Sequence, residues 1–153
     1  MSNTVEQIVT ALETGIVAKL GSTWSRLDHV HDLSKNSLRS SNNRFGVRPL
    51  SYTSQVESTI LRYLSVDHDF EVILTRNYIN RGGDSNLQTQ INQLFDDTED
   101  LAVKFFVDKL FLPSIVISVS AVNTEEPEIL EEDDTVAIRC VFTVKYRKPV
   151  DTL

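Results

Sequence analysis

Three histidines carry the side chains of this chain that are best suited to bind a metal ion. His29 and His31 lie two residues apart within the segment 28–32, and on a strand this spacing would place both rings on one face. His68, which stands between two aspartates, could supply a third ligand. One hypothesis is therefore a small metal-dependent enzyme that uses these three histidines. The favoured alternative is that they are surface histidines in polar turns, because motifs this short often arise by chance.

Cys140 is the single cysteine and a candidate nucleophile by residue type alone. It lies on the apolar side of an alternating segment, beside Ile138 and Phe142, which predicts a buried and unreactive thiol. No serine lies in a nucleophile-elbow pattern, and the glycines of residues 80–85 lack the lysine and hydroxyl pair of a phosphate-binding loop. We therefore expect no catalytic residues, no bound metal and no cofactor.

Charged residues are unevenly distributed along the chain. Seven acids and no base lie in one short stretch, and they are Glu125, Glu126, Glu128, Glu131, Glu132, Asp133 and Asp134. Removing these seven from the 22 acids leaves 15, which equals the 15 lysines and arginines. Between residues 19 and 62 bases predominate, and four of them are candidate interface residues: Arg39, Arg44, Arg48 and Arg62. Such a chain can pair with copies of itself or with another partner, although a solvated loop also explains the acids.

The composition argues against two other classes of protein. The net charge of −7 does not suit a dedicated nucleic-acid binder, and the bases between residues 39 and 62 are well separated. The start of the chain has no basic segment followed by an apolar one, and no apolar run approaches the length of a membrane span. We expect a soluble product, made in the cytoplasm.

Hydrophobic periodicity predicts an α/β (α+β) fold in one domain, residues 1–153, with a mainly antiparallel sheet and helices packed on it. Helical spacing predicts helices over residues 4–20 and 86–111, the second with a possible break near residues 96–98. The stretch 50–58 is expected to be an exposed connection. Strands are predicted over residues 59–66, 70–79, 115–122 and 135–147.

The same patterns predict which side chains are buried. The last strand alternates apolar and polar residues over more than a dozen positions, so that one face belongs to the core and the other carries cations. The expected core comprises Ile8, Leu12, Ile16, Val72, Leu74, Ile91, Leu94, Ile117, Val119, Ile138, Cys140 and Phe142.

The order of these features resembles a known family over nearly the whole chain. An N-terminal helix is followed by Trp24-Ser-Arg-Leu27, by Arg44-Phe-Gly-Val-Arg-Pro49 and by a strand ending Phe70-Glu-Val-Ile-Leu-Thr75. A helix starting near Asp84, a strand, the acidic stretch and Val-Phe-Thr-Val-Lys-Tyr-Arg147 complete the order. The chain resembles the tail terminator (tail completion) proteins of tailed bacteriophages.

The resemblance implies a structural virion protein, located at the head-proximal end of the tail. Members of that family form a hexameric ring that caps the tail tube, and the family has no catalytic residues to carry over. The implied partners are other copies of the chain, the tail tube protein and a neck or head-completion protein. DNA would pass through the lumen without sequence-specific binding. Other neck and head-closure proteins, which are similar in size, are the alternative.

A ring would give the segregated charges a use. In a head-to-tail ring the basic surface of one subunit would meet the acidic surface of its neighbour. Two alternatives stay open for the acidic stretch. It could line the channel and repel DNA, or it could point outward to the tail tube or neck.

Overall fold

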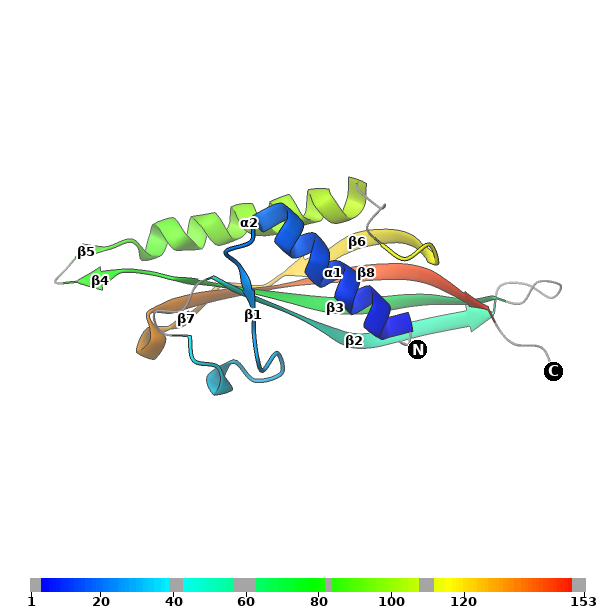
Figure 1. Cartoon of the computed structure of the whole chain (residues 1–153), viewed down its shortest axis with the longest axis horizontal. Helices are drawn as coiled ribbons and strands as arrows, with labels where there is room; N and C mark the ends of the chain where they lie inside the picture. Colours follow the sequence, from blue (N-terminus) through cyan, green and yellow to red (C-terminus); the bar gives the residue numbers. More distant parts are fainter. Residues whose placement is uncertain (1–3, 39–42, 57–62, 82–83, 108–111, 150–153) are drawn as a thin grey trace.

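A six-stranded sheet, nearly all antiparallel, forms the middle of the molecule, and two helices lie over one of its faces (Figure 1). The computed structural model describes residues 4–38, 43–56, 63–81, 84–107 and 112–149. The main strands, in spatial order, are β1 (Ser25–Arg26), β2 (Arg44–Val56), β3 (Tyr63–Asn77), β8 (Thr135–Pro149) and β6 (Val116–Thr124). The predicted fold class is confirmed.

Shorter elements complete the sheet and its surroundings. β1 pairs with β2 in parallel, and all other pairs are antiparallel. β7 (Glu128–Leu130) pairs with the start of β8, and β4 (Asn80–Arg81) and β5 (Asp84–Ser85) form a separate two-stranded hairpin. Two short 3-10 helices are η1 (Leu33–Lys35) and η2 (Glu131–Asp133).

The two helices agree closely with their predicted spans. α1 (Thr4–Leu20) ends where Gly21 adopts a positive φ of 117° and donates its N–H to the Val17 carbonyl at 2.9 Å. α2 (Leu87–Val107) is continuous through residues 96–98, and the predicted end at 108–111 lies outside the described residues. Among the described residues no helix is long and apolar enough to span a membrane.

The core lies between the helices and the sheet. It contains every expected residue except Ile117, with Ile91 half-buried against it. Phe142 on β8 meets Phe105 of α2 edge to face, with ring centroids 4.9 Å apart. The prediction for Ile117 was wrong, since its side chain is 37% exposed. A bulge between Val116 and Ser118 changes the phase of β6, so that Val119 instead faces the core.

Two predictions about the middle of the chain were also wrong. Residues 50–56 are not a connection but the second half of β2, paired with β3, although their side chains are exposed as expected. The two strands predicted over 59–66 and 70–79 are one continuous strand, β3, of which residues 59–62 lie outside the described part of the chain. Backbone pairing rather than burial holds this part of β2 in the sheet.

The second face of the sheet is partly covered by residues 27–38. A small apolar cluster holds this covering segment, with Leu27, Leu33 and Leu38 packed on Ile73 and Ala137 of the sheet. The approach is closest at Gly46, where an added Cβ would lie 2.7 Å from Cγ1 of Val30. Glycine is therefore needed at this position of β2 for the segment to pack down.

Candidate functional site

The histidine hypothesis does not agree with the structure. His29 and His31 lie in an irregular turn rather than on a strand, and both are exposed. No group of three or more potential ligands that could hold a metal occurs within the described residues. The three histidines are therefore not brought together into a metal site.

His68 instead has a structural role in β3. Its ring is 5% exposed, with Nε2 2.9 Å from the Leu50 carbonyl oxygen and Nδ1 3.4 Å from the Tyr146 hydroxyl. A neutral ring that donates from Nε2 and accepts at Nδ1 would satisfy both contacts. Leu50 lies in the irregular stretch between Pro49 and Tyr52, where the β2–β3 pairing shifts register. His68 therefore binds a carbonyl oxygen where the ladder is irregular, which explains its burial.

Cys140 is buried as predicted. Its side chain is 2% exposed on the core face of β8, and burial, with a smaller effect of Glu71, raises the pKa of the thiol from 9.0 to about 12. The thiolate is the reactive form, so this group is a poor nucleophile at neutral pH.

The acidic stretch is an ordered structure rather than a loop. Glu128 lies in β7, paired with β8, and residues 131–133 form η2. Asp134 ends this turn with a positive φ of 47°, and its carbonyl accepts the Tyr78 N–H at 2.8 Å. Burial, followed by the charges of Asp134 and Glu131, raises the pKa of Tyr78. We call residues 125–134 the acidic hairpin.

A cavity of about 500 Å³ lies between the acidic hairpin and the covering segment. Its charged lining is mostly acidic and consists of Asp32, Glu128, Glu131, Glu132 and Asp133, with Arg139 and His31. The acids are thus gathered on one side of the molecule by the pairing of β7 with β8, and they present a concentrated negative surface.

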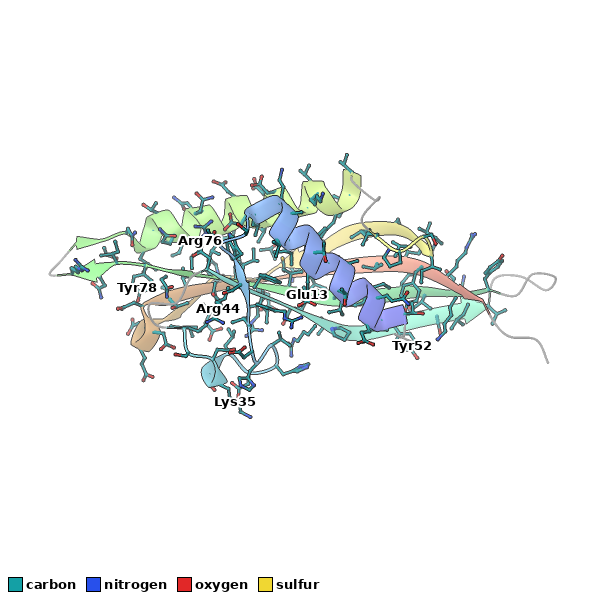
Figure 2. The ribbon with its side chains drawn as sticks, in the orientation of Figure 1. Glu13, Lys35, Arg44, Tyr52, Arg76 and Tyr78 are labelled. Carbon is teal, nitrogen blue, oxygen red and sulfur yellow. The ribbon has the colours of Figure 1, made fainter. Side chains whose placement is uncertain are left out.

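The basic candidate residues are arranged differently from the expectation. Arg48 donates from Nε to Oε1 of Glu71 at 2.7 Å, and Arg139 donates to the same oxygen at 3.0 Å. Arg44 donates to the Arg26 carbonyl at 3.1 Å (Figure 2). Arg48 is therefore bound to a carboxylate of its own chain, 6% exposed, and is less available to a partner. Arg39 and Arg62 lie outside the described residues.

Other bases lie at the far end of β8 from the acidic hairpin. Lys145, Arg147 and Lys148 follow one another near its end, and the acidic hairpin lies at its start (Figure 1). At about 3.3 Å per residue the two ends of the strand are ~40 Å apart. Lys145 is opposite Asp67, and Arg147 lies over the Tyr63 ring. The clustering of bases after Val144 was visible in the sequence, but only the continuous strand shows its distance from the acids.

Comparisons with known proteins give one class of match. No family model matches the sequence, and the search of curated proteins finds no match. Among 29 matching chains of solved structures is one from the virion of a native gene transfer agent particle. It has a TM-score of 0.60 at 10% identity, and the match covers 97% of this chain and 100% of the other. At this identity the likeness shows a shared fold.

Proposed function

We propose that this chain is a structural protein of a tailed phage or phage-like particle, and specifically a tail terminator. The observation that carries the proposal is the end-to-end match, over 97% of this chain, to a chain of a virion particle. The likeness of element order and motifs to the tail terminator family supports the narrower role. The solvent-exposed acids of the hairpin form no enzyme-like site within the described residues, which fits a role in binding rather than in catalysis.

In this role the chain forms a ring, a hexamer by resemblance, that caps the tail tube. One face of the ring contacts the tail tube protein, and the other contacts a neck or head-completion protein. A head-to-tail ring needs two different surfaces on each subunit. The acidic hairpin and the bases at the far end of β8 provide two such surfaces of opposite sign. DNA passes through the ring without base-specific contacts.

Disrupting the gene in the host that produces the particle tests the role. A tail terminator stops tube growth and joins the tube to the head, so particles without it should have unjoined heads and tubes of irregular length. Complementation with the intact gene should restore joined particles. Tubes of normal, uniform length beside heads that have lost their DNA would contradict the tail terminator role and favour a neck or head-closure protein.

A further inference from the structure

The strongest unassigned feature is a pair of apolar surfaces on different flanks of the molecule. The first is a groove of about 610 Å³ where α1 passes β1 and β2. We call it the α1 groove. Its lining includes Val17 and Ala18 of α1, together with Trp24 and Phe45. The groove is mainly apolar, and such concave apolar surfaces are typical of binding sites.

The second surface is a stripe of exposed apolar side chains on α2. Phe95, Val103 and Val107 are 40%, 58% and 78% exposed. Intervals of eight and four residues place them on one side of the helix, away from the buried positions Leu94 and Leu101. We call this the α2 stripe. Three large apolar side chains on one exposed helix face are unusual on a monomer and indicate a contact surface.

The two surfaces cannot meet within one chain. The α1 groove lies at the β1–β2 margin of the sheet, whereas α2 packs against β3, β8 and β6 (Figure 1). The groove and the stripe share no residue. Identical copies can therefore join head to tail, each offering its stripe to the next groove, and such a contact closes into a ring when the rotation is right.

The dimensions of the two surfaces agree. The α1 residues that line the groove run from Thr10 to Ala18 and span ~12 Å, and the α2 stripe spans ~18 Å, at about 1.5 Å per residue. A helix whose apolar side chains enter a groove is a common way of docking.

Charge also favours a second copy as the occupant. Asp96, Glu99 and Asp100, all exposed, surround the α2 stripe. At the α1 groove Arg26 and the exposed Lys19 oppose a single acid, Glu13, which Arg26 contacts at 3.3 Å. The groove margin is therefore net positive and the stripe margin is negative. Docking the two would place opposite charges together around an apolar centre, which is the usual anatomy of a protein interface.

We propose that the α2 stripe of one copy docks in the α1 groove of the next, and that this contact joins neighbouring subunits of the ring. The inference rests on the proposed function for its partner, because it takes the neighbour to be a second copy of this chain. It assigns the subunit contact to the helical layer, with the charged ends of β8 left to contribute beside it or to meet other partners.

Paired cysteines test the contact. Ala18 and Val103 are both exposed, one in the groove and one in the stripe, and native Cys140 is buried and will not compete. The double variant Ala18→Cys/Val103→Cys is placed in the full chain, incorporated into particles and gently oxidised. A matched control, Ala18→Cys/Val56→Cys, keeps one cysteine and moves the other to an exposed site on β2.

We expect the groove–stripe pair to give a ladder of covalent multimers on a non-reducing gel and the control pair to give none. Particles that contain the chain but show no ladder with the groove–stripe pair would overturn the docking and leave the proposed function standing. The same oxidation on concentrated purified protein separates the two ideas in the other direction. A ladder there, with no chain in the particles, would support the docking and overturn the virion role.

Discussion

Asp97 joins three parts of the fold through one carboxylate. It is 3% exposed on α2 and receives two hydrogen bonds from Arg76 of β3, at 2.7 and 3.1 Å. The Arg76 guanidinium also lies over the Trp24 ring, 5.2 Å from its centroid, where the end of α1 approaches α2 (Figure 2). A break near residues 96–98 was considered because three polar residues interrupt the apolar pattern. The structure shows that they are held by a partner on the sheet instead.

Replacing Asp97 with alanine should therefore be strongly destabilising. The change leaves the Arg76 charge half-buried without its carboxylate, and breaking a buried pair in this way costs ~3–5 kcal/mol of unfolding free energy. Asp96→Ala, at the exposed neighbouring position, is the matched control and should change stability by less than ~0.5 kcal/mol. Urea unfolding of both variants measures the difference. Equal stability of the two would show that the Arg76–Asp97 pair does not hold α2 to the sheet.

Cys140 predicts a pH dependence of stability. Its pKa is raised from 9.0 to about 12 by burial, so the folded state keeps the neutral thiol while the unfolded chain loses its proton from about pH 9 upward. The stabilising contribution is complete below pH 9 and is lost as the pH rises toward 12. Cys140→Val removes this contribution, so the stability difference between wild type and variant should change over that range. A difference independent of pH would contradict the burial of this thiol.

At the scale of elements, the sequence predicted what repeats and missed what depends on distant partners. α1 and β8 have apolar residues at regular intervals, so their spans and buried faces were predictable. The outer half of β2 has only exposed side chains, so nothing but its pairing with β3 identifies it as a strand. Arg48 was misjudged for the same reason, because its partner Glu71 lies 23 residues away in sequence and is adjacent only across the sheet.

The covering segment depends on Gly46 of β2, and a double-mutant cycle tests this. Gly46→Ala places a methyl group 2.7 Å from Val30, which should cost ~1–3 kcal/mol through overpacking. In a Val30→Ala background most of that contact is removed, so Gly46→Ala should become neutral or stabilising through its effect on the unfolded chain. Thermal unfolding of the four proteins gives the coupling energy. Equal effects of Gly46→Ala in both backgrounds would mean that the segment does not pack on Gly46.

For the whole molecule, the acidic hairpin should act in assembly and not in folding. Changing Glu131, Glu132, Asp133 and Asp134 to Gln or Asn keeps the backbone contacts of the turn, and Asn is well tolerated at the left-handed position 134. The variant should fold normally but associate more weakly with tails or with itself at low salt. Each exposed ion pair is worth ~0–1 kcal/mol, and salt screens such pairs. Unchanged assembly at every salt concentration would leave the hairpin as a solvated connector.

The position of the chain in the particle tests the central claim most directly. Cryo-electron microscopy of intact particles, with the density fitted by the six-stranded sheet and its two helices, would locate every copy. The account predicts a closed ring of this chain at the head-proximal end of the tail tube, with the acidic hairpin at an interface or along the channel. Finding the chain in the capsid shell, at the distal tip of the tail, or absent from the particle would contradict it.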